Sequence, residues 1–257
     1  MSTQAGAFRK RLLAGEWLAG AFINLGSAVT AEIAGRSGFD WLLLDYEHGP
    51  GSDETLLSQL QALGGTAVTP LVRIAANEAP RFKRVLDLGS AGVMVPYVTT
   101  VAEAQAAVAA GHYPPRGIRG VSKFNRAAGF GQDFEAYFAR SGEETTIVVQ
   151  IENMAGVDAS EAIAAVEGVD ALFVGPLDLS TNLGIVGQVD HPRLVEARRR
   201  VAAAARRAGK AAGILLTAEA QIEQVRAEGF TLVTFGSDGG AVATGLRQAA
   251  TALKKSR

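Results

Sequence analysis

Residues 147–180 read IVVQIENMAGVDASEAIAAVEGVDALFVGPLDLS, and in this stretch two short apolar runs flank a segment with helical periodicity. The runs, Ile147–Ile151 and Ala171–Val174, have the β-branched and aliphatic content of buried strands. Parallel neighbouring strands need a crossover of roughly a dozen residues or more, usually a helix, and the intervening segment is long enough for one. The stretch therefore predicts a β–α–β unit of a parallel sheet.

The same unit repeats along the chain. The eight predicted strands are Leu18–Ile23, Trp41–Asp45, Val68–Val72, Gly92–Val95, Ile147–Ile151, Ala171–Val174, Gly213–Leu216 and Leu232–Phe235. Eight βα units in 257 residues, without a linker between halves, favour a closed (β/α)8 TIM barrel over an open doubly wound sheet. The GxGxxG pattern of a dinucleotide-binding sheet does not follow the first strand. We predict one α/β barrel domain over residues 1–257, with a final helix, Ala241–Lys255, that either closes the barrel or packs on another subunit.

The composition excludes several classes of function. The 25 basic and 26 acidic residues give a net charge of −1, so the chain has no field that would attract nucleic acid or an anionic membrane. No apolar run is long enough to cross a membrane, and we expect a cytoplasmic protein whose partner is a small molecule. The absence of cysteine excludes disulfides, thiolate metal sites and thiol nucleophiles. Any metal must therefore bind oxygen or imidazole.

Polar residues follow four of the predicted strands at the end where barrels of this type build their active sites. Burial alone would favour apolar residues there, because ionisable groups are costly to desolvate. Their convergence on one mouth indicates chemistry. The segments are Asp45-Tyr46-Glu47-His48-Gly49-Pro50, Arg73, Gln150-Ile151-Glu152 and Gly175-Pro176-Leu177-Asp178.

Two carboxylates in these segments suggest a metal site. Gln150 and Glu152 are two residues apart on one strand and so share a face, here the barrel axis, while Asp178 follows the neighbouring strand. Two carboxylates at one rim repel each other unless a cation lies between them, and oxygen ligands select Mg²⁺, Mn²⁺ or Co²⁺. The alternative is that each carboxylate only caps the helix that follows it. No organic cofactor is expected.

A base and a cation complete the predicted site. His48 lies three residues after Asp45, whose carboxylate is expected to orient the imidazole and raise its basicity. Arg73 would face the same mouth and could hold a carboxylate or a developing oxyanion. A structural histidine and a salt bridge at the rim are the alternatives.

These segments resemble the metal-dependent pyruvate aldolases of the 4-hydroxy-2-oxoheptanedioate aldolase family, within the phosphoenolpyruvate/pyruvate-binding barrel superfamily. The resemblance runs nearly end to end. The residues that carry it are Gly38-Phe39-Asp40-Trp41 with residues 45–50, Tyr113-Pro114-Pro115-Arg116-Gly117-Ile118-Arg119-Gly120, Gln150-Ile151-Glu152, and Gly168-Val169-Asp170 through Gly175-Pro176-Leu177-Asp178-Leu179-Ser180.

The resemblance implies a role for each site residue. By it, Glu152 and Asp178 are metal ligands, His48 is the base, and Arg73 stabilises the enolate oxygen. It makes Asp87 a group that tunes the basicity of the histidine. The helix after the third strand would carry Asp87 ~16 Å from the mouth by its rise, so this contact is expected from a neighbouring subunit. The substrate contacts that it implies are Gln150, Arg73, Gly175, Pro176 and the Leu177 backbone amide.

The resemblance also implies an activity and an assembly. The activity is a reversible retro-aldol cleavage of 4-hydroxy-2-oxo acids to pyruvate and an aldehyde through a metal-bound pyruvate enolate, in the catabolism of aromatic compounds or sugar acids. The assembly is a homohexamer, a trimer of dimers in which the last helix is exchanged. In this hypothesis a long, Pro-, Gly- and Arg-rich connection, residues 111–145, holds the distal end of the substrate with four basic side chains: Arg116, Arg119, Lys123 and Arg126.

Three rival functions remain open at this point. A lysine Schiff-base aldolase would need a lysine facing the axis, and none of the six lysines falls inside a predicted strand with that orientation. An acyl-CoA lyase on the same barrel would need an added C-terminal segment for the CoA. A non-catalytic ketoacid-binding protein would bind pyruvate without enolising it.

Overall fold

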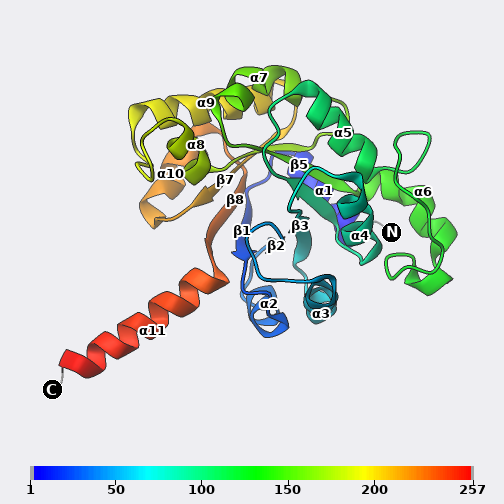
Figure 1. The fold of residues 1–257 in the computed structure, drawn as a ribbon, viewed down its shortest axis with the longest axis horizontal. Coiled ribbons are helices and arrows are strands. Elements are labelled where there is room, and N and C mark those ends of the chain that lie inside the picture. Colours follow the sequence, from blue (N-terminus) through cyan, green and yellow to red (C-terminus); the bar gives the residue numbers. More distant parts are fainter. Residues whose placement is uncertain (1–2, 256–257) are drawn as a thin grey trace.

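The computed structural model describes residues 3–255, in which eight parallel strands close into a barrel (Figure 1). Each strand pairs with the next along the chain, and the last pairs with the first. The predicted TIM barrel is confirmed, and every predicted strand lies within two residues of its observed bounds. The strands are β1 (Leu18–Ile23), β2 (Trp41–Asp45), β3 (Thr69–Arg73), β4 (Gly92–Val95), β5 (Thr146–Ile151), β6 (Ala171–Val174), β7 (Ala211–Leu216) and β8 (Leu232–Ser237).

Helices cover the outside of the barrel, except for α1, which closes its base, and α11. Figure 1 shows α11 projecting away from the other elements, and none of its residues is buried. The helices are α1 (Gln4–Leu13), α2 (Ala28–Gly35), α3 (Asp53–Leu63), α4 (Ala79–Asp87), α5 (Val101–Gly111), α6 (Phe134–Glu144), α7 (Met154–Ala164), α8 (Pro176–Asn182), α9 (Pro192–Arg207), α10 (Ile222–Glu228) and α11 (Asp238–Lys255), with 3-10 turns η1 (Gly129–Gly131) and η2 (Glu219–Gln221). Within residues 3–255, no helix has both the length and the apolar content that a membrane span requires.

Side-chain alternation along the strands divides the apolar residues into two cores. One core fills the barrel, where Trp41 and Phe173 pack edge to face with ring centroids 6.4 Å apart. Gly20 makes room for this layer, because a Cβ there would lie 2.6 Å from the Trp41 ring. The second, larger core lies between the strands and the helices. The barrel is therefore solid, and ligands are confined to its ends.

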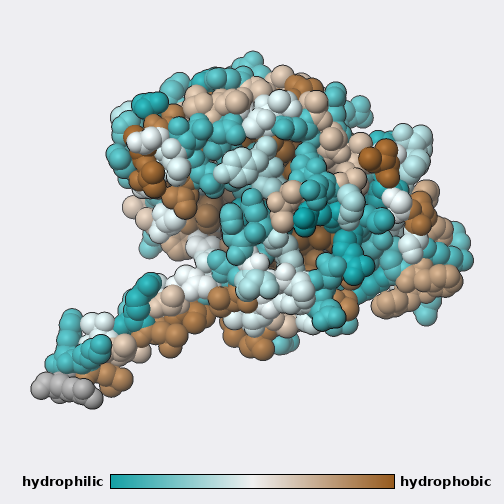
Figure 2. Space-filling model, in the orientation of Figure 1, coloured by the Kyte–Doolittle hydropathy of each residue, from teal (hydrophilic) through white to brown (hydrophobic). Residues whose placement is uncertain are grey.

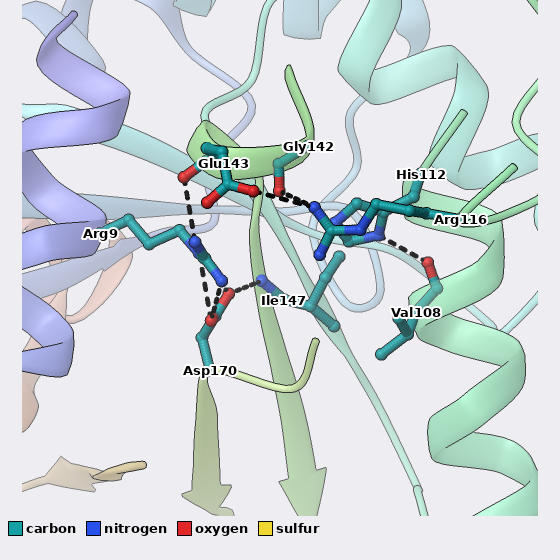
Figure 3. Close-up of polar contacts among 8 residues, drawn as sticks. All are labelled: Arg9, Val108, His112, Arg116, Gly142, Glu143, Ile147 and Asp170. Atoms are coloured by element: carbon teal, nitrogen blue, oxygen red, sulfur yellow. Dashed lines mark hydrogen bonds and ion pairs between the residues drawn. The ribbon is translucent and has the colours of Figure 1, made fainter. Parts of the chain in front are cut away.

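The end of the barrel where the strands begin is closed by α1. Asp170, just before β6, is 1% exposed and accepts hydrogen bonds from the Arg9 guanidinium, at 2.7 Å from Nη2, and from the Ile147 backbone N–H at 2.9 Å (Figure 3). Phe8 and Leu12 of the same helix enter the inner core. Buried charge-assisted contacts of this kind fix α1 across the base and leave the opposite end as the mouth.

The connection between α5 and β5 contradicts one expectation. It contains α6, and it lies at the closed end, because α5 runs away from the mouth and β5 starts at the base. Its basic residues serve the fold: Arg116 binds Glu143 and the Gly142 carbonyl, and Arg126 donates to the carbonyls of Leu60 and Leu88.

The other two basic residues of this connection also lie away from the mouth. Arg119 is buried against Asp87, and Lys123 is exposed on the same segment. The expectation that the four basic side chains hold a substrate at the mouth of their own chain is therefore wrong. A connection from a helix to a strand lies at the opposite end from one that runs from a strand to a helix.

Candidate active site

The mouth of the barrel brings together the polar residues that end β2, β3 and β5. Asp45, Arg73, Gln150 and Glu152 are all buried, and they have the same parity as the residues that fill the barrel interior. Asp45 and Arg73 are direct partners in the register of β2 and β3. The predicted inward orientation of Arg73, Gln150 and Glu152 agrees with this arrangement.

Arg73 lies between two carboxylates. Its Nε and Nη2 bind the Asp45 carboxylate at 2.9 and 2.7 Å, and its Nη1 lies 3.0 Å from Oε2 of Glu47. Burial alone would lower the pKa of Arg73, but the hydrogen bonds and charge of Asp45 and the charge of Glu47 outweigh it and raise the pKa. The guanidinium is therefore a fixed, permanent cation at the mouth.

Asp45 has a different partner from the one that the sequence predicts. Besides Arg73, its Oδ1 accepts the backbone N–H groups of Glu47 and His48, at 3.1 and 3.3 Å. The carboxylate thus fixes the turn that carries His48 and does not contact the imidazole. The His48 side chain is 66% exposed, and its Nε2 lies 3.8 Å from Oε2 of Glu47.

Glu47 is a site residue that the sequence reasoning did not single out. It is two residues after Asp45, so the alternation that selected Gln150 and Glu152 could have found it. Its Oε2 is buried and forms the ion pair with Arg73, but no residue in the range 3–255 donates a hydrogen bond of good geometry to it. Burial, opposed by the charge of Arg73, raises the pKa of the Glu47 carboxyl.

Glu152 is held by donors on both of its oxygens. Oε1 accepts from Nε2 of Gln150 at 2.9 Å, and Oε2 accepts from the backbone N–H of Tyr97 at 3.2 Å. Gly175 packs directly on this carboxylate, since a Cβ there would lie 2.3 Å from Oε1. Burial, with the nearby charges of Asp178 and Glu47, raises the pKa of Glu152 to about 7. The positive charge near the Glu152 carboxylate is therefore too small to offset its burial and the two neighbouring carboxylates.

Asp178 approaches the same place from α8. It lies in the first turn of this helix, is half-buried, and its Oδ1 accepts from the Tyr97 hydroxyl at 3.1 Å. Pro176 and Leu177 are the first two residues of α8; proline has no backbone N–H, and at the second position the N–H has no carbonyl acceptor within the helix. The Leu177 N–H is therefore free of the helix's own hydrogen-bond ladder.

The donor set fits a divalent cation with oxygen ligands. Glu152 and Asp178 raise each other's electrostatic energy, which a cation between them would relieve. Oε1 of Gln150 is buried and has no hydrogen-bond partner among residues 3–255. This oxygen can therefore accept a hydrogen bond from a bound ligand or water. In the same range of residues, no group of three or more His, Cys, Asp or Glu side chains is placed so that it could hold a metal ion. Two protein carboxylates would leave most coordination positions open.

Asp87 lies away from this mouth. It ends α4 at the closed end of the barrel, where its Oδ1 accepts from Nη2 of Arg119 at 2.7 Å. The rings of Tyr113 and Tyr137 lie 4.5 and 5.8 Å from that guanidinium. Within one chain Asp87 and His48 are therefore at opposite ends of the barrel.

Comparison with known proteins agrees with the fold and shows the family of the chain. The model of the HpcH/HpaI aldolase/citrate lyase family matches residues 18–244. A 5-keto-4-deoxy-D-glucarate aldolase of Salmonella paratyphi C is 44% identical over 248 residues, 96% of each chain. A crystal structure of an HpcH/HpaI family protein from Burkholderia cenocepacia has a TM-score of 0.92, 37% identity and coverage of 97% and 99%. That of an HpcH/HpaI aldolase from Desulfitobacterium hafniense has a TM-score of 0.89, 29% identity and coverage of 96% of each chain. The chain belongs to the HpcH/HpaI aldolase/citrate lyase family of enzymes.

Proposed function

We propose that the chain is a metal-dependent aldolase that reversibly cleaves a 4-hydroxy-2-oxo acid into pyruvate and an aldehyde. One observation carries the proposal: carboxylates from two neighbouring βα units, Glu152 and Asp178, hydrogen-bond to the same residue, Tyr97, beside a buried cation, Arg73. Glu152 and Asp178 would hold Mg²⁺, Mn²⁺ or Co²⁺. When bound there, such an ion would supply Lewis-acid polarisation of the substrate's keto group.

The protein's own groups then account for the proton transfers. His48, exposed at the mouth on a turn fixed by Asp45, takes the proton of the C4 hydroxyl, directly or through a water. The C4–O bond becomes a carbonyl as the C3–C4 bond breaks, and its electron pair passes to the pyruvate enolate. Arg73 holds the enolate's negative charge. The protonated His48 then returns its proton to C3, directly or through the same water, which yields pyruvate. The Gln150 side chain and the Leu177 amide orient the ketoacid.

The substrate class is narrowed by the relative that acts on 5-keto-4-deoxy-D-glucarate. Numbered from its other end, such a compound is a six-carbon diacid with a 2-oxo and a 4-hydroxyl group. Cleavage between C3 and C4 would give pyruvate and a three-carbon hydroxy-aldehyde acid. We therefore place sugar diacids of this type first among the substrates of this chain.

The C-terminal helix supports an assembly of several copies. Val242 and Leu246 of α11, one helical turn apart, are 46% and 67% exposed, and Figure 2 shows hydrophobic residues along one edge of this projecting helix. We propose that α11 is exchanged between two subunits of a hexamer. In that assembly Asp87 would reach the His48 of a neighbouring copy.

Leu246→Asp is expected to lower the molar mass of the protein in solution, because it places a charge in the apolar edge of α11. Light scattering after size-exclusion chromatography measures this mass. Gln248→Asp adds the same charge to the other side of the helix and should leave the mass unchanged. Equal masses for all three proteins would contradict the exchange of α11.

Chelation followed by reconstitution tests the proposed activity. The protein is treated with EDTA, supplied with Mg²⁺, Mn²⁺ or Co²⁺, and assayed for pyruvate release with a panel of 4-hydroxy-2-oxo acids that differ in length and distal charge. We expect activity to be lost with the ion and restored by it, with the six-carbon diacids cleaved fastest. Release of pyruvate that survives chelation, or a borohydride-trapped lysine adduct, would contradict the mechanism. Pyruvate binding without cleavage of any compound would indicate a binding protein.

A further inference from the structure

Tyr97 contacts both carboxylates of the proposed metal site. It lies in the loop between β4 and α5, and its backbone N–H donates to Oε2 of Glu152 at 3.2 Å, while its hydroxyl donates to Oδ1 of Asp178 at 3.1 Å. We infer that Tyr97 is a positioning residue, which sets the orientation of both carboxylates toward a divalent cation. This inference rests on the proposed function.

The backbone of Tyr97 is held in an unfavourable conformation. Its φ is +52°, in the left-handed region that residues with a Cβ seldom adopt. Such conformations persist only where the surroundings impose them, and they cluster at functional sites. At Tyr97 this conformation allows the amide to point at Glu152 while the side chain reaches Asp178.

The loop around Tyr97 is fixed by contacts on its C-terminal side. The Val98 N–H donates to the Gln150 carbonyl at 3.1 Å, which ties the loop to the strand that carries Glu152. The N–H groups of Thr99 and Thr100 donate to Oε2 of Glu103, at 2.8 and 3.0 Å, at the start of α5. Tyr97 is thus anchored to the site that it serves.

Packing does not explain the side chain of Tyr97. The residue is 52% exposed, so water can reach its hydroxyl and burial does not require a hydrogen-bond partner within the protein. Asp178 is half-buried in the first turn of a short helix, and the phenol fixes one of its two oxygens. With Oδ1 held by Tyr97, Oδ2 remains for the cation. Hydrogen bonds of this kind orient the ligands of metal sites, and their loss commonly lowers metal affinity 10- to 100-fold.

The test is a direct measurement of Mn²⁺ binding to metal-free protein, by the electron paramagnetic resonance signal of the free ion. Tyr97→Phe removes one hydroxyl and keeps the ring and the amide. We expect its dissociation constant for Mn²⁺ to rise roughly tenfold. The visible absorption band of Co²⁺ bound to this variant should also shift, whereas the thermal midpoint of the metal-free protein should not change.

Tyr46→Phe is the matched control. It also loses one phenol hydroxyl, which donates to Oε1 of Gln59 at 2.8 Å and not to either carboxylate of the site. Its Mn²⁺ affinity should match that of the unmodified protein. Equal affinity in Tyr97→Phe and the unmodified protein, or an equal loss in Tyr46→Phe, would overturn the role of Tyr97 and leave the proposed function standing. No Mn²⁺ binding by the unmodified protein would overturn both.

Discussion

Glu152→Ala is expected to abolish divalent metal binding and to lower the rate of pyruvate release by about three orders of magnitude or more. A chelated ion supplies several kcal/mol of transition-state stabilisation, and each 1.36 kcal/mol corresponds to about a tenfold change in rate. Glu152 is the buried member of the carboxylate pair, so Asp178 alone would leave the ion weakly held. Calorimetric titration with Mg²⁺ and a pyruvate-release assay measure the two losses.

Two further variants make this result interpretable. Glu152→Gln keeps the size of the side chain beside Gly175 and removes its charge, so it should lose metal affinity as Glu152→Ala does. Glu161→Ala removes an exposed carboxylate of α7 that pairs with Arg207, and it should keep both affinity and rate. Metal affinity and turnover in Glu152→Ala equal to those of the unmodified protein would contradict a catalytic metal held by Glu152.

Arg73→Lys is expected to lower kcat by about 10²- to 10³-fold, the range seen when one preorganised donor to a developing oxyanion is lost. Lysine keeps the positive charge between Asp45 and Glu47 but cannot reproduce the two parallel hydrogen bonds that Arg73 makes to Asp45. The turn that carries His48 depends on the same Asp45 carboxylate. Steady-state kinetics with a sugar diacid, beside a urea unfolding curve, separates the effect on rate from the effect on stability.

Arg73→Ala extends this comparison. It leaves the carboxylates of Asp45 and Glu47 without their cation, and breaking a buried ion pair in this way costs about 3–5 kcal/mol of folding free energy. Arg200→Lys, at an exposed position on α9, is the control and should change neither quantity. An Arg73→Lys enzyme with full kcat would show that Arg73 serves only to hold the turn.

The sequence pattern was sufficient to predict the barrel and the inward side of its strands. The eight apolar runs are a repeating signal, and strand alternation is a fixed geometric rule that placed Gln150 and Glu152 on one face. The same rule applied to β2 would have added Glu47. The sequence predicts that the final helix either closes the barrel or packs on another subunit. The absence of buried residues in α11 excludes closure within its own chain.

Features that depend on side-chain direction in loops could not be predicted. Asp45 lies three residues from His48, but its carboxylate contacts Arg73 on the neighbouring strand, because register brings those two residues side by side. Tyr97 is uncharged and does not belong to a periodic pattern. The role that we infer for it depends on its positive φ, which the local sequence does not predict. The length and basic residues of the α5–β5 connection suggest a place beside the substrate, whereas chain direction places the connection at the base.

The most direct test of the central claim is the exchange of the pyruvate methyl protons with deuterated solvent, followed by NMR in the presence and absence of Mg²⁺. This exchange reports the enolisation of pyruvate alone and does not depend on which aldehyde the enzyme accepts. We expect exchange that requires the ion and disappears in both Glu152→Ala and Asp178→Ala. Exchange at full rate in ion-free protein, or none with the ion bound, would contradict the claim that these two carboxylates hold a cation that activates a ketoacid.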